Sequence, residues 1–172
     1  GGMATMLAAH REIGNAEHRA EVEALWGVEG LSARPGLPAV DMFDAIADGR
    51  IKAVWIACTN PVHSMPDIGR VRKALDKAEF VVVQEAFVQT DTVPYADVLL
   101  PATTWGEKSG TVTNSERRIS RVHAALDAPG EARADWWIAA EVARRLEGRL
   151  AGRGQHQEGK PAATPVWRER AD

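Results

Sequence analysis

The run Ala53-Val-Trp-Ile-Ala-Cys-Thr-Asn-Pro61 constrains the fold more than any other stretch of this 172-residue chain. Its first six residues are apolar and rich in β-branched and aromatic types, which is typical of a strand covered on both faces of a parallel sheet. We therefore predict that it forms the central strand. Pro61 cannot donate a ladder hydrogen bond and favours extended or turn geometry at Asn60, so the chain should leave the sheet there.

Two further apolar runs, Phe80-Val-Val-Val-Gln84 and Ala96-Asp-Val-Leu-Leu100, predict strands of the same sheet. An order in which strands alternate with helices is the pattern of parallel crossover units. The sequence thus predicts an α/β fold: a three-layer domain with a mostly parallel, Rossmann-like sheet. Capping residues and helical periodicity predict helices at about 15–26, 39–48, 64–77 and 134–146. We expect residues 1–14 to be irregular and 105–122 to form a long polar loop with short extended pieces.

The composition excludes several classes of protein. A formal net charge of −3 gives no electrostatic footprint for nucleic acid or an anionic membrane, so neither partner is expected. No apolar stretch approaches the roughly 20 residues that a membrane helix needs. Residues 1–10 lack the basic and apolar regions of a secretory signal, and we expect them to be an internal point of a longer chain. The single cysteine, Cys58, fits a reducing compartment, and we expect the cytoplasm.

Polar side chains follow the predicted strands where each would leave the sheet. Asn60 comes after the first strand, Gln84 and Glu85 after the second, and Lys108 lies in the loop beyond the third. Ligands of open α/β sheets bind at this carboxyl edge. Amides, a carboxylate, an ammonium group and nearby hydroxyls suit a purine dinucleotide, although no Gly-x-Gly-x-x-Gly run follows any strand. The hydroxyls belong to Thr90, Thr92, Thr111 and Thr113.

Each of these residues also has a purely structural interpretation. An asparagine before proline is commonly a turn residue, and Glu85 or Lys108 could be a solvated charge. Cys58 lies inside the predicted apolar strand, where we expect a small buried hydrophobic residue and not a nucleophile. The residues alone therefore predict a nucleotide-sized crevice and leave the reaction open.

Six blocks of sequence occur here in the order found in the molybdopterin oxidoreductases of the dimethyl sulfoxide reductase family. The chain resembles this family most closely in its bacterial assimilatory nitrate reductases, over about residues 1–147. Six ordered blocks are far more specific than any one of them. They are Trp-Ile-Ala-Cys-Thr-Asn-Pro at 55–61, Val-Val-Val-Gln-Glu-Ala-Phe at 81–87, Thr-Asp-Thr at 90–92, Ala-Asp-Val-Leu-Leu-Pro-Ala at 96–102, the segment from Trp105 to Ser120, and Pro-Gly-Glu-Ala-Arg-Ala-Asp-Trp-Trp at 129–137.

The resemblance implies that residues 1–147 are an α/β domain that binds one molybdopterin guanine dinucleotide of a molybdenum bis(molybdopterin guanine dinucleotide) cofactor. By motif, Asn60, Gln84, Glu85, Lys108 and Asp135 fall where nitrate reductases of the family contact it. Relatives often have Ser-Asp where this chain has Gln84-Glu85, which moves the carboxylate outward by one methylene. The implied reaction is two-electron reduction of nitrate to nitrite, fed by an iron–sulfur cluster.

The chain also departs from the family pattern. The amino-terminal cysteine cluster, a molybdenum-ligating cysteine and the downstream cap domain are not found in this sequence, so we expect an internal fragment that is inactive alone. Its partners would be the remaining domains of the parent enzyme and an electron-donor protein or domain. We find no resemblance after Glu147 and expect a flexible tail over 148–172. Another family member, such as a formate dehydrogenase, and a non-catalytic nucleotide-binding module remain alternatives.

Overall fold

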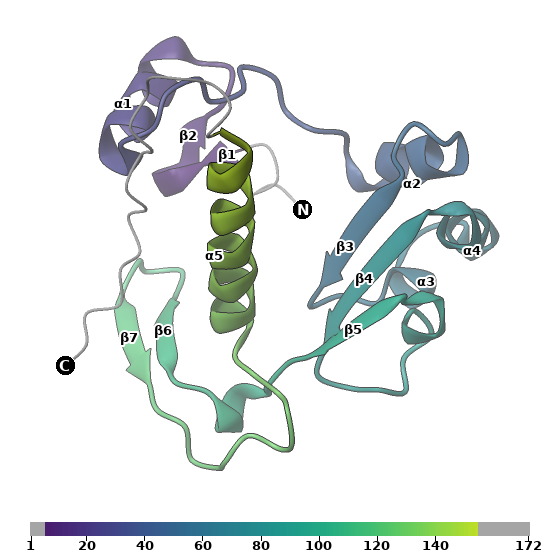
Figure 1. The fold of residues 1–172 in the computed structure, drawn as a ribbon. Helices are drawn as coiled ribbons and strands as arrows, with labels where there is room; N and C mark the ends of the chain where they lie inside the picture. Colours follow the sequence, from purple (N-terminus) through teal and green to yellow (C-terminus); the bar gives the residue numbers. More distant parts are fainter. Residues whose placement is uncertain (1–5, 155–172) are drawn as a thin grey trace. The chain divides into compact units, whose positions relative to one another are not determined.

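The structure of the protein is a computed structural model that describes residues 6–154; residues 1–5 and 155–172 lie outside the described part. The chain divides into two compact units, and the colours of Figure 1 give the position of each residue along the sequence. One unit comprises residues 1–39 and 146–172, and the other comprises Val40–Arg145. All five predicted site residues belong to the second unit.

The amino-terminal part of the first unit, residues 6–39, contains a two-stranded antiparallel sheet and an α-helix. Strands β1 (Met6–Leu7) and β2 (Arg11–Glu12) are joined by the 3-10 helix η2 (Ala8–His10), so the prediction of an irregular segment over 1–14 was wrong for these residues. Helix α1 (Ala16–Trp26) confirms the predicted helix. The side chain of Asn15 accepts hydrogen bonds from the first turn, and Gly27 ends the helix with φ +65°, a conformation that a residue without Cβ adopts readily.

The second unit is built on a three-stranded parallel sheet with the order β3-β4-β5. These strands are Ala53–Ala57, Phe80–Glu85 and Val98–Pro101, which confirms the predicted α/β class and parallel pairing. The prediction that the first run forms the central strand was wrong, because β4 is the central strand and β3 is an edge strand among the described residues. Strand β4 pairs with β3 along one side and with β5 along the other.

Three helices cover one face of this sheet. Residues of α2 (Ala39–Ala47), α3 (Pro61–Ser64) and α4 (Ile68–Lys77) form a hydrophobic core with alternate residues of β3 and β4. Asp67 caps α4 by accepting a hydrogen bond from the Arg70 amide. The buried core residues are Phe43, Ile46, Val54, Ile56, Val62, Val71, Ala74, Leu75, Val81 and Val83.

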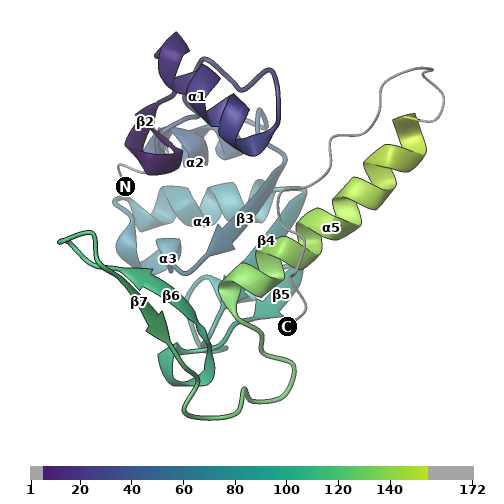
Figure 2. The ribbon, with the colours of Figure 1, turned by 90° about the vertical axis from the view of Figure 1, so that its left-hand side faces the viewer.

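The opposite face of the sheet is only partly covered. Helix α5 (Asp135–Gly154) begins on this side, while α2 and α4 lie on the other, as the two views in Figures 1 and 2 show. Trp55 of β3 and Phe80 of β4 remain 41% and 45% exposed. The prediction that the first strand is covered on both faces was therefore wrong. Its apolar residues alternate between a packed face and an open one, a difference that hydrophobicity alone does not report.

The polar segment after β5 is more regular than predicted. A 3-10 helix η4 (Trp105–Glu107) is followed by an antiparallel hairpin of β6 (Gly110–Thr113) and β7 (Ile119–Val122). A further 3-10 helix, η3 (Val93–Tyr95), precedes β5. The predicted short extended pieces are thus the two strands of one hairpin, as Figure 2 shows.

Helix α5 ends at Gly154, eight residues later than predicted, so the first part of the expected tail is helical and the remainder, 155–172, lies outside the described residues. Among residues 6–154, no helix combines the length and the apolar character needed to cross a membrane.

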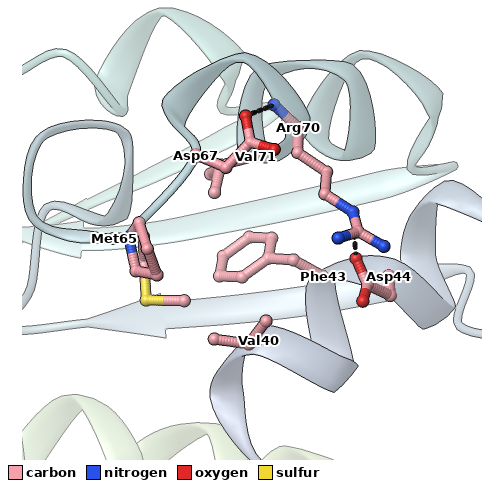
Figure 3. A pocket seen from close by; sticks show the side chains of 8 residues that line it. Val40, Phe43, Asp44, Met65, Asp67, Arg70 and Val71 are labelled. Carbon is pink, nitrogen blue, oxygen red and sulfur yellow. Dashed lines mark hydrogen bonds and ion pairs between the residues drawn. The ribbon is translucent and has the colours of Figure 1, made fainter.

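A pocket of about 210 Å³ lies between α2 and α4 on the helical side of the second unit. Figure 3 shows its apolar wall, made by Val40, Phe43 and Met65, and the ion pair between Arg70 and Asp44 at its side. None of the five predicted site residues lines this pocket. The pocket is a gap between packed helices and is not the predicted crevice.

Candidate functional site

The carboxyl ends of the three parallel strands meet at one edge of the sheet. In the strand register, Ala57 lies opposite Gln84, and Glu85 lies opposite Pro101. The backbone continues this alignment beyond the strands, because the Cys58 amide donates to the Gln84 carbonyl (3.2 Å) and the Ala102 amide donates to the Glu85 carbonyl (3.0 Å). The residues that follow the strands are therefore neighbours, as the sequence predicted.

A fourth segment joins this edge from far along the sequence. The Arg133 amide donates to the Pro101 carbonyl (3.1 Å), and the Thr103 amide donates to the Arg133 carbonyl (3.0 Å). These bonds form a short parallel bridge between Ala102 and Arg133. Because α5 starts two residues after Arg133, the bridge places Asp135, the first residue of that helix, at the carboxyl edge.

Asp135 is the centre of a hydrogen-bonded cluster at this edge. Its Oδ1 accepts from Gln84 Nε2 at 2.8 Å and from the Cys58 thiol at 3.3 Å, and its Oδ2 accepts from Lys108 Nζ at 2.7 Å. The Lys108 ammonium also lies 5.1 Å from the centre of the Trp105 ring, within the range of a cation–π contact. Three of the five predicted site residues, Gln84, Lys108 and Asp135, are thus joined by direct hydrogen bonds.

The surroundings of Asp135 favour its charged form. Burial acts to raise its pKa, but hydrogen bonds from Lys108, Gln84 and Cys58 outweigh burial and hold the pKa of the carboxyl below its usual value. The position at the start of α5 supports the same charge, because a helix N-terminus carries a partial positive charge. Asp135 is therefore an anion that fixes the positions of an amide and an ammonium group.

Cys58 differs from its prediction. It follows β3 instead of lying within it, it is exposed, and it has φ +59°, in the left-handed region that few residues with a side chain adopt. Desolvation, the hydrogen bond to Asp135 and the charge of that carboxylate raise the pKa of the thiol. The residue is accessible, but its environment disfavours the thiolate that a nucleophile requires.

The two remaining predicted residues lie at the same edge with other partners. Glu85 is half-buried, and its Oε1 accepts hydrogen bonds from the backbone amides of Ala86 (2.8 Å) and Phe87 (3.3 Å). Its charge contributes to the raised pKa of Cys58, so it borders the cluster. Asn60 is not bonded to the cluster: its Oδ1 accepts from Thr92 Oγ1 at 2.6 Å.

Thr103 is a site candidate that the sequence did not single out. Its side chain is 4% exposed, and its hydroxyl has no hydrogen-bond partner within residues 6–154. Buried polar atoms are nearly always satisfied, so this hydroxyl beside the Arg133 bridge is a polar group with hydrogen-bonding capacity left at the edge. The only signal in the sequence was its position two residues after a strand end.

The polar side chains at this edge suit a polar, anionic organic group better than a bare metal ion. It combines an ammonium group, two amides, two carboxylates and hydroxyls, which match phosphate, ribose and base atoms. Among the residues that the structure describes, no group of three histidine, cysteine or acidic side chains could hold a metal ion. Nucleotide chemistry therefore fits the residues that are present.

Comparison with known proteins identifies the family. The family model for molybdopterin oxidoreductases matches residues 4–145. The chain belongs to the molybdopterin oxidoreductase family. A nitrate reductase from Klebsiella oxytoca is 52% identical over 85% of this chain and 17% of its own length. A nitrate reductase from Synechocystis sp. is 48% identical over 85% of this chain and 21% of its own length.

The molybdopterin oxidoreductase chain thus spans about a fifth of the length of these relatives. An acetylene hydratase from Pelobacter acetylenicus has a similar fold, with a TM-score of 0.57 and 22% identity over 84% of this chain and 19% of that one. At that identity the likeness concerns the fold alone. The predicted family membership and α/β class are both confirmed.

Other relatives bear on the finer predictions. A putative formate dehydrogenase from Bacillus subtilis is 40% identical over 81% of this chain and 14% of its own length. A nitrate reductase from Symbiobacterium thermophilum is 42% identical over 98% of this chain and 22% of its own length. The predicted extent of the resemblance, about residues 1–147, agrees with the family model over residues 4–145, while the last of these matches also runs into the carboxyl-terminal segment.

Proposed function

We propose that this chain is a cofactor-binding domain of a molybdenum-dependent nitrate reductase, in which it grips one molybdopterin guanine dinucleotide. The observation that carries the proposal is the cluster of Gln84, Lys108 and Asp135 at the carboxyl edge of a parallel sheet. The high identity to nitrate reductases supports the choice of reaction, two-electron reduction of nitrate to nitrite. When bound, the cofactor supplies the redox chemistry at molybdenum, and the domain supplies orientation and electrostatics.

Each residue has a role that follows from its contacts. The Lys108 ammonium would offset phosphate charge, and the Asp135 carboxylate holds that ammonium in place at 2.7 Å. Gln84 donates its amide N–H to Asp135, so its amide oxygen is the atom left to accept from the cofactor. Glu85 offers a carboxylate to ring or ribose hydrogen-bond donors, and Asn60 offers an amide at the end of β3.

The wider assignments follow from the same proposal. The complete enzyme would carry a molybdenum bis(molybdopterin guanine dinucleotide) cofactor, with an iron–sulfur cluster in its amino-terminal part. The remaining domains and an electron-donor protein or domain would be the partners, and the isolated chain would not reduce nitrate. Relatives include an assimilatory nitrate reductase catalytic subunit and a periplasmic nitrate reductase, so the cytoplasmic location is a prediction drawn from the single cysteine.

The test uses the full-length enzyme that contains this chain. Lys108→Ala should lower the molybdenum and guanine nucleotide content of the purified protein, while Lys73→Ala, an exposed lysine on α4, should leave both unchanged. Metal content is measured by mass spectrometry and nucleotide by chromatography after acid release. Equal cofactor content in the two variants would remove Lys108 from the site.

A formate dehydrogenase is the second candidate, favoured by the 40% identical relative named above. Reduction of nitrate by the full-length protein with an artificial electron donor, without oxidation of formate, supports the nitrate reductase; the reverse result supports the formate dehydrogenase. A non-catalytic nucleotide-binding module would instead bind GTP tightly and show no preference for the molybdenum dinucleotide.

A further inference from the structure

Asn60 and Thr92 form a side-chain pair that the family resemblance does not explain. Thr92 is completely buried, and its hydroxyl donates to Asn60 Oδ1 at 2.6 Å while accepting from the Val62 backbone amide at 3.2 Å. The two paired side chains are 32 residues apart in the sequence. The contact therefore depends on tertiary structure.

Asn60 does not cap the helix that follows it, although its position is one where asparagine commonly does so. Asn60 directly precedes the short helix α3, where an asparagine side chain commonly accepts a hydrogen bond from the first turn. Here the side chain makes no such capping bond. Its oxygen is directed to Thr92 instead, so the simple interpretation of Asn60 as a helix cap does not account for its orientation.

The hydroxyl of Thr92 determines which amide atom of Asn60 it meets. If the amide were reversed, its nitrogen would donate to Thr92 Oγ1, and the Thr92 hydroxyl would lose its acceptor in a fully buried position. Leaving a buried donor without an acceptor destabilises the protein, because the donor has lost its hydrogen bonds to water and gains none in return. The oxygen therefore faces Thr92, and the amide nitrogen, which has no partner among residues 6–154, is the end that remains to bind a ligand.

We propose that Thr92 is a positioning residue that locks the Asn60 amide so that it presents N–H donors at the carboxyl edge of β3. The ligand atom that Asn60 binds is then a hydrogen-bond acceptor, a carbonyl or phosphate oxygen of the dinucleotide, and not an N–H or O–H donor. This inference rests on the proposed function and adds the polarity of one contact within the same site.

The first experiment measures how fast the purified full-length holoenzyme releases guanine nucleotide. Thr92→Val removes the hydroxyl at nearly constant volume, and Thr92→Ser keeps it. We expect release about tenfold faster for the valine variant, which corresponds to the loss of the hydrogen bond between Asn60 and the nucleotide. The serine variant should release nucleotide at nearly the wild-type rate. In an Asn60→Ala background, Thr92→Val should cause no further change, because the group it positions is gone.

The second experiment does not depend on how well Thr92→Val folds. Asn60→Asp retains an oxygen that accepts from Thr92 but removes both N–H donors, so it should release nucleotide at least as fast as Asn60→Ala. Nucleotide release at the wild-type rate from Asn60→Asp would overturn the inference, as would equal effects of Thr92→Val in the wild-type and Asn60→Ala backgrounds. Wild-type release from Asn60→Ala would instead remove Asn60 from the proposed cofactor site.

Discussion

Replacing Asp135 by asparagine tests whether this carboxylate organises the candidate site. The substitution keeps the shape and one oxygen, which can still accept from Gln84, but it places an amide where the Lys108 ammonium needs an acceptor. We therefore expect the bond to Gln84 to persist and the bond to Lys108 to be lost. The chain itself, followed by tryptophan fluorescence in a urea titration, provides the assay.

The expected loss in the free energy of unfolding lies between two limits. An exposed ion pair contributes about 0–1 kcal/mol, whereas breaking a fully buried one costs about 3–5 kcal/mol. The side chains of Lys108 and Asp135 are 21% and 29% exposed, an intermediate environment. We expect Asp135→Asn to lower the free energy of unfolding at pH 7 by about 2 kcal/mol, close to the value of one hydrogen bond to a charged group.

The pH dependence of the stability difference separates the effect of the Asp135 charge from the effect of its packing. The pKa of Asp135 is lowered in the folded protein, so its charge stabilises the fold above the unfolded value of roughly 4, and this contribution is lost as the pH falls through the folded pKa. The difference between wild type and Asp135→Asn should thus be constant near neutral pH and shrink below about pH 4.

The matched control is Asp127→Asn, which removes an exposed carboxylate of the same unit and should change stability by less than about 0.5 kcal/mol. A wild-type advantage over Asp135→Asn that stays constant well below pH 4 would refute the electrostatic reasoning, as would equal effects of the two substitutions at pH 7.

Three further predictions concern other parts of the chain. The Cys58 thiol should react with iodoacetamide more slowly at neutral pH than a free cysteine, and Asp135→Asn should speed the reaction by lowering the raised pKa of the thiol; a pH–rate profile measures this. Asn15→Ala should destabilise the unit that contains α1 by about 1 kcal/mol in urea unfolding, since two amides lose their cap. Ile46→Ala should cost about 2–5 kcal/mol because Ile46 is 1% exposed in the core, whereas Ile119→Ala, at a 70% exposed position, should cost under about 0.5 kcal/mol in the same assay.

Local sequence patterns were enough to predict most of the helices and strands and the edge of the sheet at which the candidate site lies. Asn15 and Gly27 mark the two ends of α1. The hydrogen bonds of Asn15 and the backbone angles of Gly27 involve only residues close in sequence, so this local pattern predicted the helix. The β3 and β4 runs ended in polar residues, and parallel strands bring such ends together because they share a direction. The ordered motifs also indicated the family, which the family model confirmed.

The central strand, the open face of β3 and the pairing of side chains became clear only from the folded structure. Apolar character is the same whether a neighbour lies on one side or on both, so the sequence could not show that β3 is an edge strand. The bonds from Gln84 to Asp135 and from Thr92 to Asn60 join residues 51 and 32 positions apart. Such contacts depend on the crossover path of the whole chain, because no local pattern encodes the distance between two side chains that meet only after folding.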